Sequence, residues 1–347
     1  MGELTSKRYR VGDSIEAVNR LYYARGWTDG LPIVPPTEDA VVVMLAAGGH
    51  EPGDLIAKVP PKFGHATVEK VAINAVMAGC LPAYLPVIIA TLEALCDERF
   101  NLGAIQATTH PCAPLLIING PIRKALEVNS GHGLFGPGWR ANATIGRAIR
   151  LILMNIGGAA PGILDKATQG HPGKFAFCIA ENEEATPWEP LHVERRYAAE
   201  VSTVTVTAVE APHNIHDPSS VSGTGILKSC AATLSSLGSN NAFFMGGEPL
   251  LILGPEHAAT IARDGLGKAE IKAFLFEHAR NPLHAFSAEN IQARYQAFSP
   301  GDLVPIASRA EDFMIVVAGG AGKHSCCLLS FGSPSLSVTR PIRWKER

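Results

Sequence analysis

APLLIINGPIRKALEV, residues 113–128, has the order of a βα unit: an apolar run, a Gly-Pro turn and a pattern typical of a helix. EPLLILGPEHAATIARDG, residues 248–265, repeats this order in the second part of the chain. An apolar run bounded by turn residues predicts a buried strand, and the residues after each Gly-Pro predict a helix. Strands that alternate with helices are typical of α/β folds, so the two segments predict an α/β protein with an internal repeat.

The elements around these two segments follow in the same order in both parts of the chain. The predicted elements are helices over 142–155 and 268–280 and strands over 103–110, 174–184, 202–209, 241–247, 312–324 and 336–342. We expect two similar αβ halves, related by internal duplication and packed about a pseudo-twofold axis, with a cleft between them. Coincidence is the alternative, because a strand, a Gly-Pro turn and a helix often follow one another.

Three regions are predicted along the chain. They are an N-terminal helical arm or lid over 1–60, a first α/β half over 61–210 and a second α/β half over 211–347. In the arm, residues 13–25 have an amphipathic helical pattern, and Thr37 is placed to cap a second, short helix. We expect a structural role for this arm.

The composition favours a protein with a large core relative to its polar surface. Of the 347 residues, 46% are hydrophobic and 18% are charged, which predicts a homo-oligomer that covers apolar surface. The formal net charge of −2 and the lack of a long basic run argue against nucleic acid as a partner. Residues 71–95 form the most apolar stretch, but Asn74, Pro82 and Glu93 interrupt it. It therefore predicts two core helices and no membrane span.

The seven cysteines indicate a reducing environment. Their number is odd and no C-x-x-C pair occurs, which is unlike a disulfide framework or a zinc knuckle. The first ten residues also lack the pattern of a secretory signal. We therefore expect a cytoplasmic protein.

The segment VVAGGAGKHSCCLLSFG, residues 316–332, is the first candidate site. It is not a nucleotide-binding P-loop, because Val317 stands where the first glycine is required and His324 where the hydroxyl residue is required. The amides around its glycines predict a site for a carboxylate or an oxyanion, with His324 transferring protons and Cys326 assisting as a thiol. Burial as ordinary strand residues is the alternative for Cys326 and its neighbour Cys327. The residues predicted to bind substrate here are Gly319, Gly320, Gly322, Lys323 and Ser325.

The corresponding strand of the first half ends in IAENEE, residues 179–184. A carboxylate at the end of an apolar strand suits a general base if burial raises its pKa, and Glu181 is closest to the strand. Trp188 in the following loop is predicted to line the substrate site, and His192 is a candidate partner or metal ligand. Because the two strands hold the same position in their halves, we expect Lys323 and His324 to meet Glu181 across the cleft.

The loop GHGLFGPGW, residues 131–139, contains a formal G-x-G-x-x-G. A helix precedes it and Pro137 follows the third glycine, which distinguishes it from a dinucleotide-binding fingerprint. We expect His132 and Trp139 to line a substrate pocket. Asn142 is predicted to bind substrate and to cap the next helix, whose N-terminus favours an anion.

Three further segments carry candidate residues. TTHPCAP, residues 108–114, ends a predicted strand, with Thr108 and Thr109 as substrate-binding residues and His110 as a catalytic one. DKATQGHPGK, residues 165–174, offers His171 and Lys174 as anion contacts, and HNIHD, residues 213–217, carries two histidines and an aspartate. A metalloenzyme is an alternative that requires convergence of some of the histidines His110, His192, His213 and His216.

Five motifs taken together carry a resemblance to a known family. They are GWTDGLPIVPPT, INGPI, FGPGWRANATIGRA, IAENEE with a tryptophan after three further residues, and VVAGGAGKHS. The chain resembles, over nearly its whole length, an uncharacterised family of bacterial proteins of about this size. That family is associated with small proteins carrying a UGSC motif, in which U is selenocysteine. The resemblance implies a thiol- or selenol-containing partner and redox or carbon–heteroatom chemistry, as in systems of the glycine reductase type.

The residues favour an enzyme that acts on a small, carboxylated substrate without a nucleotide cofactor. The predicted chemistry is that of an acid/base or thiol-assisted lyase or hydratase, with His324 and Glu181 handling protons. An oxidoreductase subunit that works with a separate thiol or selenol protein is one alternative. A metal-dependent hydrolase and a binding protein without catalytic activity are the others.

Overall fold

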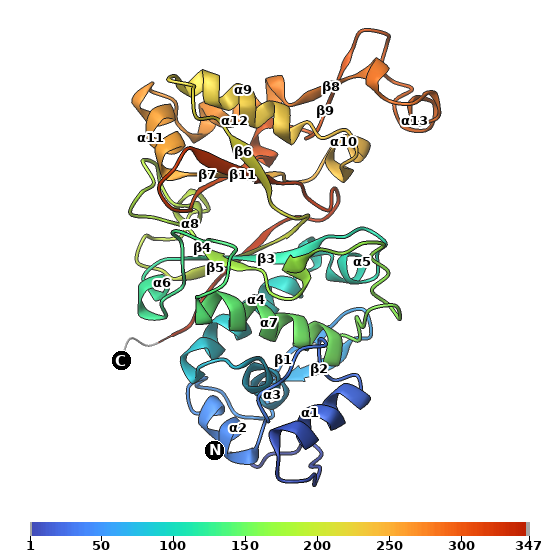
Figure 1. The fold of residues 1–347 in the computed structure, drawn as a ribbon, viewed down its shortest axis with the longest axis vertical. Helices are drawn as coiled ribbons and strands as arrows, with labels where there is room; N and C mark the ends of the chain where they lie inside the picture. The colour runs from blue at the N-terminus through green and yellow to red at the C-terminus, as the bar shows by residue number, and fades with distance from the viewer. Residues whose placement is uncertain (1, 345–347) are drawn as a thin grey trace.

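Two four-stranded sheets lie face to face, and helices cover the outer face of each sheet, as the computed structural model shows (Figure 1). The structure describes residues 2–344, so residue 1 of the predicted arm and residues 345–347 of the predicted second half lie outside it. The mixed α/β class predicted from the sequence is confirmed. Among the described residues, no helix is both long and apolar enough to cross a membrane.

The first sheet has the strand order β12-β5-β3-β4. Its central strand β3 runs parallel to β4 and antiparallel to β5, and β5 runs antiparallel to β12. The strands are β3 (Ala113–Asn119), β4 (Cys178–Ala180), β5 (Thr203–Val209) and β12 (Val338–Pro341). This sheet and its helices are called the first lobe, and the second sheet with its helices the second lobe. The helices of the first lobe are α3 (Val68–Ala78), α4 (Leu85–Leu95), α5 (Leu102–Gln106), α6 (Ile122–Ala125) and α7 (Arg140–Asn155).

The second sheet has the strand order β10-β7-β11-β6 and the same pattern of directions. Strand β7 runs parallel to β10 and antiparallel to β11, and β11 runs antiparallel to β6. The strands are β6 (His213–His216), β7 (Leu250–Leu253), β10 (Met314–Val317) and β11 (His324–Leu328). The helices are α9 (Gly223–Leu234), α10 (Asn240–Phe244), α11 (Pro255–Arg263), α12 (Lys268–His278) and α13 (Ala288–Arg294).

Alternate residues of each central strand belong to different cores, which explains why these strands are apolar throughout. In β3, Leu115 and Ile117 pack between the sheets, whereas Leu116 packs beneath the helices of the first lobe. In β7, Ile252 packs between the sheets, and Leu251 packs beneath the helices of the second lobe. Successive side chains of a strand point to opposite faces, so a strand covered on both faces has no polar side.

The N-terminal region is largely part of the first lobe. Helix α2 (Glu38–Leu45) begins at Thr37, whose hydroxyl accepts from the Ala40 amide, as predicted. It buries Met44 and Leu45 in the first core, and the hairpin of β1 (Leu55–Val59) and β2 (Gly64–Thr67) follows. Helix α1 (Ile15–Ala24) buries no residue and lies outermost, at the bottom of Figure 1.

Two strands predicted upstream of the central strands are wrong. The interval 103–110 forms the short helix α5, and 241–247 begins with the short helix α10. Ser239 caps α10 by accepting from the Ala242 amide, and Asn101 begins α5 in the left-handed conformation. Local capping thus outweighs the apolar pattern of segments too short to show a period.

The last predicted strand, 336–342, also differs from the prediction. It forms β12, but β12 pairs with β5 of the first sheet, because Val338 is buried in the core of the first lobe. The interval 211–347 therefore contributes strands to both sheets. The remaining elements are α8 (Leu191–Glu194), β8 (Arg280–Pro282), β9 (Leu303–Pro305) and the 3-10 turns Pro82–Tyr84, Glu98–Phe100, Pro172–Lys174, Leu283–Ala285 and Ala310–Asp312.

Both Gly-Pro turns carry a glycine because another strand approaches the backbone closely. A Cβ atom on Gly120 would lie 2.7 Å from the Val201 carbonyl oxygen, and one on Gly254 would lie 2.1 Å from that of His324. In each turn a serine hydroxyl accepts from a backbone amide: Ser202 from Ile122, and Ser325 from Gly254. The two turns thus share the same packing against the start of β5 or β11.

Candidate functional site

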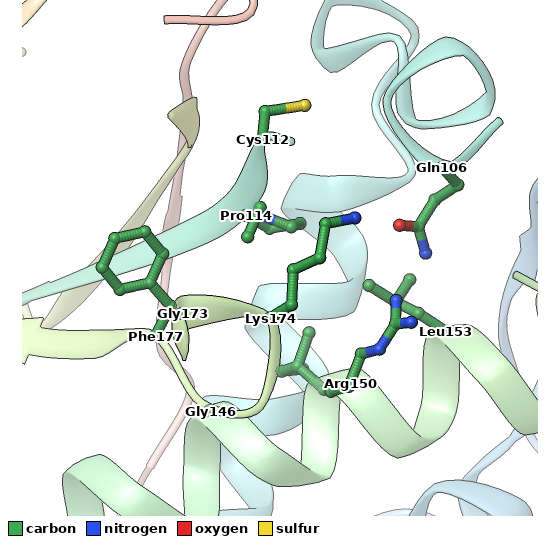
Figure 2. A pocket seen from close by; sticks show the side chains of 11 residues that line it. Gln106, Cys112, Pro114, Gly146, Arg150, Leu153, Gly173, Lys174 and Phe177 are labelled. Carbon is green, nitrogen blue, oxygen red and sulfur yellow. The ribbon is translucent and has the colours of Figure 1, made fainter. Parts of the chain in front are cut away.

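A pocket lies on the first lobe at the amino end of β3 (Figure 2). Its cavity volume is small, about 20 Å³, and the pocket opens to solvent; the space between its walls, solvent included, is about 310 Å³. Helices α5 and α7, the start of β3 and the segment after the 165–174 loop form its walls. The lining residues are Gln106, Cys112, Ala113, Pro114, Gly146, Ile149, Arg150, Leu153, Gly173, Lys174 and Phe177.

Two cations of the pocket share one carboxylate. Arg150 Nη2 lies 3.1 Å from Asp165 Oδ2, and Lys174 Nζ lies 2.9 Å from the same oxygen. All three side chains are largely buried. Their formal charges sum to +1, so the group carries one positive charge that Asp165 does not balance.

The shared carboxylate is held in its charged form. Burial acts to raise the pKa of Asp165, but hydrogen bonds from Lys174 and the Ala167 amide and the two cationic charges outweigh it, so the net pKa is lowered. Burial lowers the pKa of Arg150 from its usual very high value, and Asp165 opposes this shift. An arginine remains charged at neutral pH, so the net positive charge of the pocket persists.

Gln106 adds an unsatisfied donor to the same pocket. The side chain is 3% exposed, and its Nε2 has no hydrogen-bond partner among the described residues. In Figure 2 the ends of Gln106, Arg150 and Lys174 lie toward one another. A buried polar group without a partner is rare, because it costs about 1–3 kcal/mol, and it marks a place for a ligand or an ordered water.

The pocket exists because the segment after the 165–174 loop passes directly over α7. A Cβ atom on Gly146 would lie 2.6 Å from the Phe177 backbone nitrogen, so only glycine allows this approach. The Thr168 amide donates to the Thr109 carbonyl and joins the loop to the TTHPCAP segment. Two segments that carry predicted site residues therefore meet here.

Two histidines lie close to the pocket. His110 Nε2 is 2.9 Å from Glu210 Oε1, and its Nδ1 accepts a long hydrogen bond, 3.3 Å, from the Cys112 amide. His171 Nδ1 accepts from the Gly173 amide at 3.1 Å, and its buried Nε2 has no partner in the part of the chain that the structure describes. Burial and the Lys174 charge lower the pKa of His171, and a backbone contact with Val209 opposes this shift.

The predicted residues Thr108 and Thr109 shape this loop. The Thr108 hydroxyl accepts from the His110 amide, and the Thr109 carbonyl accepts from Thr168. Neither side chain lines the pocket.

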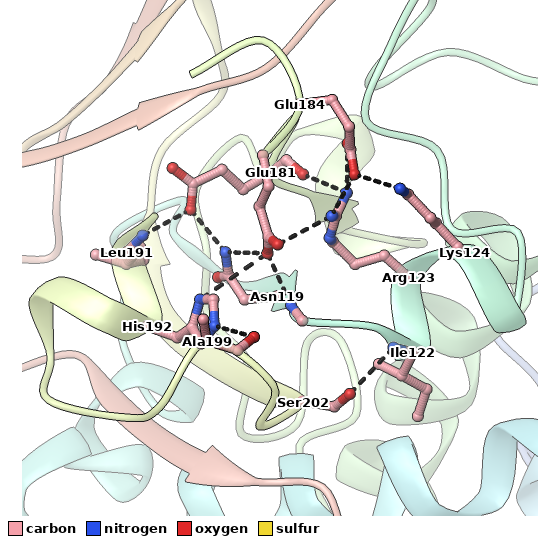
Figure 3. A network of polar contacts seen from close by, with 12 residues as sticks. Asn119, Ile122, Arg123, Lys124, Glu181, Glu184, Leu191, His192, Ala199 and Ser202 are labelled. Carbon is pink, nitrogen blue, oxygen red and sulfur yellow. Dashed lines mark hydrogen bonds and ion pairs between the residues drawn. The ribbon is translucent and has the colours of Figure 1, made fainter. Parts of the chain in front are cut away.

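Glu181 lies at the opposite end of the first sheet, in a buried network (Figure 3). Its side chain is 0% exposed. Oε2 accepts from Asn119 Nδ2 at 2.7 Å and from the Leu191 amide at 2.8 Å, and Oε1 has no partner among residues 2–344. Burial raises the pKa of Glu181, and the Lys268 charge opposes this shift. The sequence-based expectation of a raised pKa thus agrees with the environment of this carboxyl.

Arg123 neutralises the other two acids of this network. Its guanidinium donates to Glu183 at 2.9 Å, to Glu184 at 3.0 Å and to the Glu181 carbonyl at 3.0 Å. His192 is fully buried; its Nε2 bonds to the Ala199 carbonyl at 3.3 Å, and its Nδ1 lies 3.9 Å from Glu183.

The segment after Glu181 fastens the first lobe to the second. The Asn182 amide donates to the Val317 carbonyl, and Trp188 Nε1 donates to the Leu266 carbonyl at 3.1 Å. Glu194 of α8 pairs with Lys268 and Lys272 of α12. Trp188 thus lies in an interlobe contact.

The charged residues of the 316–332 segment have partners of their own. Lys323 Nζ donates to the Pro218 carbonyl at 2.8 Å. His324 Nδ1 is 2.9 Å from Asn214 Oδ1, and its ring stacks on His216 with 4.4 Å between centroids. Among the described residues, no hydrogen bond or ion pair joins Glu181 to Lys323 or His324. The predicted contact of Glu181 with Lys323 and His324 is therefore not observed among the described residues.

The glycines of the same segment contact backbone and side chains of both lobes. The Gly319 amide donates to the Ser130 carbonyl, and the Gly322 amide donates to Glu256. His132 lies against Gly320, where a Cβ atom would be only 1.9 Å from its Nδ1. The two glycine-rich loops predicted as separate binding sites are thus in contact with each other.

Ser325, Cys326 and Cys327 begin strand β11. The Ser325 hydroxyl is buried between the Gly254 amide and His257 Nδ1, at 3.1 Å and 2.8 Å. Burial raises the pKa of both Cys326 and Cys327 to about 12. Both cysteines are therefore protonated thiols at neutral pH, which is the state expected of ordinary strand residues.

Asn142 has a different position from the predicted helix cap. Helix α7 begins at Arg140 with Trp139 as its first flanking residue, and no side chain caps it. The Asn142 side chain accepts from the Asn129 amide and donates to the Cys178 carbonyl, so it joins two loops. Trp139 is 43% exposed.

The histidines considered as metal ligands are found in separate contacts. His110 is with Glu210, His192 with Ala199, and His216 with His324. Within residues 2–344, no three His, Cys, Asp or Glu side chains are arranged to hold a metal ion.

Comparisons with protein-family models, with curated proteins and with solved structures gave no match. The assignment of the site therefore depends on its geometry. Sequence reasoning missed Gln106, Arg150, Asp165 and Glu210. Arg150 could have been found as a charge inside the apolar run of a predicted helix, and Glu210 as an acid directly after a buried strand.

Proposed function

We propose that the protein is an enzyme that transfers protons to and from a small, carboxylated substrate at the pocket of the first lobe. The reaction class that fits best is that of a lyase or hydratase, in which a base removes one proton and an acid supplies another. The observation that supports this most directly is the pair of His110 and Glu210 beside a pocket with a net positive charge.

His110 is the proposed proton-transferring residue. The Cys112 amide donates to Nδ1, so in the neutral ring Nδ1 carries the lone pair and Nε2 carries the proton that faces Glu210. A carboxylate on the second nitrogen orients such a ring. His171, whose Nδ1 accepts from the Gly173 amide, is the second imidazole beside the pocket.

A screen of small carboxylic acids for turnover tests this function. We expect His110→Asn to reduce turnover about 10²–10⁴-fold, which is the usual contribution of general acid–base catalysis. Glu210→Gln should lower the rate and shift the pH profile, because Glu210 acts through His110. His278→Asn, at an exposed position on the second lobe, is the control and should keep the rate. Equal rates for the His110 variant and the wild-type protein would rule out the proposal.

Catalysis with a thiol from a partner protein is the second candidate function. Burial raises the pKa of all seven cysteines of this chain, so thiolate chemistry would need an external thiol or selenol. Turnover that appears only when a small thiol is added would support this candidate. Turnover by the purified chain alone would exclude it.

We also infer that the two lobes arose by duplication and are related by a pseudo-twofold axis. The equal patterns of strand direction, the paired glycines Gly120 and Gly254 and the paired serines Ser202 and Ser325 support this inference. The cytoplasmic location and the homo-oligomer expected from the composition belong to the same proposal, and size-exclusion chromatography with light scattering tests the latter.

A further inference from the structure

We propose that Arg150, Lys174 and Gln106 form a subsite for a single carboxylate that is attached to a short apolar chain. The subsite is the cationic end of the pocket in Figure 2. The proposal extends the proposed function. Only the statement that the bound ligand is the substrate rests on that function. Binding of a carboxylate stands on the geometry of the pocket alone.

The hydrogen-bond donors of the subsite are not used up by the protein. Within the described part of the chain, the Arg150 guanidinium makes one hydrogen bond, and the Lys174 ammonium makes one, both to Asp165 Oδ2. Gln106 Nε2 makes none. A guanidinium has five N–H groups and an ammonium has three, so several donors remain for a ligand.

The charge of the subsite selects one negative charge. Arg150 and Lys174 carry two positive charges against the single charge of Asp165, and all three groups are shielded from water. Glu210 is the next acid, and its charge also affects Cys112 of the pocket wall. With Asp165 counted, one positive charge is in excess, and Glu210 lies nearby as a further negative charge. A monoanion therefore fits better than a dianion.

The remaining walls select an apolar chain. Ile149, Leu153 and Phe177 are apolar residues of the pocket lining, and Pro114 lies at the start of β3. In Figure 2, Leu153 lies beside Arg150 and Phe177 lies across the pocket from it. Cys112 adds a protonated thiol, because burial raises its pKa to about 12. A short monocarboxylate can place its charged end on Arg150 and Lys174 and its carbon chain on these apolar residues.

Isothermal titration calorimetry with butyrate and with inorganic phosphate tests the subsite. We expect butyrate to bind, and Arg150→Met to weaken it at least about tenfold, because a charge-assisted hydrogen bond is lost. Gln106→Leu keeps every charge and should weaken butyrate about three- to tenfold. Arg263→Met, at an exposed arginine of α11 outside the pocket, is the matched control and should leave the affinity unchanged.

Asp165→Asn should change the butyrate affinity in the direction opposite to Arg150→Met and Gln106→Leu. Among residues 2–344 it removes the one carboxylate that both cations contact, so the net charge of the group rises from +1 to +2. Butyrate should therefore bind more tightly to this variant if the subsite is real. Weaker binding would overturn the proposal, because it would mean that Asp165 only holds the loop in place.

Other results would also overturn the proposal. They are the absence of butyrate binding, phosphate binding that is equal or tighter, and butyrate binding that Gln106→Leu and Arg150→Met leave unchanged. Thermal melting of each variant identifies misfolding, and Gln106→Leu alone decides if the arginine variant does not fold. Butyrate binding that depends on Arg150, together with full turnover in His110→Asn, would retain the subsite and reject the proposed function.

Discussion

The two ends of the first sheet each hold a cluster of charged side chains, but the clusters differ in what surrounds them. At the amino end of β3, two cations share one aspartate beside open space, and the Gln106 amide is unpaired. At the carboxyl ends of β3 and β4, Arg123 contacts three glutamates, of which Glu181 and Glu183 are largely buried and Glu184 is half exposed. Charge alone thus does not define a binding site: unpaired donors next to a cavity do.

The largest expected effect is a difference in the free energy of unfolding between variants of Arg123 and Arg150. Arg123→Met would leave the largely buried Glu183 without its arginine partner, and we expect the free energy of unfolding to fall by about 3–5 kcal/mol. Glu184 is half exposed and keeps its pair with Lys124, so it adds little to this loss. Arg150→Met should cost less than half of this, because Lys174 still neutralises Asp165. Urea unfolding of both variants measures the difference. Equal losses of unfolding free energy would show that Arg150 stabilises the fold as strongly as Arg123 does.

A second effect concerns the pH dependence of stability. Burial raises the pKa of Glu181 in the folded protein above its unfolded value. The native state therefore keeps this proton as the pH rises, and stability falls between the unfolded pKa, about 4.3, and the folded pKa. Glu181→Gln removes this titration, so the variant should gain stability relative to the wild type as the pH rises from the unfolded pKa toward the folded one. Parallel stability curves over this range would contradict the assignment.

The smallest effect is expected at the interlobe contact of Trp188. Trp188→Phe keeps an aromatic ring but loses the hydrogen bond to the Leu266 carbonyl, which should cost about 1 kcal/mol in the free energy of unfolding. Butyrate affinity should not change, because Trp188 does not line the pocket. A loss of butyrate affinity in this variant would place the binding site near Trp188 and Glu181, outside the pocket.

The α/β class, the strand–Gly-Pro–helix units and the Thr37 cap could be predicted from the sequence, because local patterns determine them. Helices α5 and α10 could not, since five residues are too few to show a helical period. The site was predicted in part, through His110, His171 and Lys174. Its other members depend on tertiary contacts. The pairing of Ala113 with Val209 brings Glu210 to His110, and the Thr168–Thr109 hydrogen bond joins the 165–174 loop to the TTHPCAP segment.

The most direct test of the central claim is a crystal structure of the protein with 4-bromobutyrate, whose bromine can be located by anomalous scattering. We expect a carboxylate within hydrogen-bond distance of Arg150, Lys174 and Gln106, with the bromine against apolar residues of the pocket lining. A ligand bound at the Glu181 network or at the 316–332 segment, with the pocket of the first lobe empty, would contradict it.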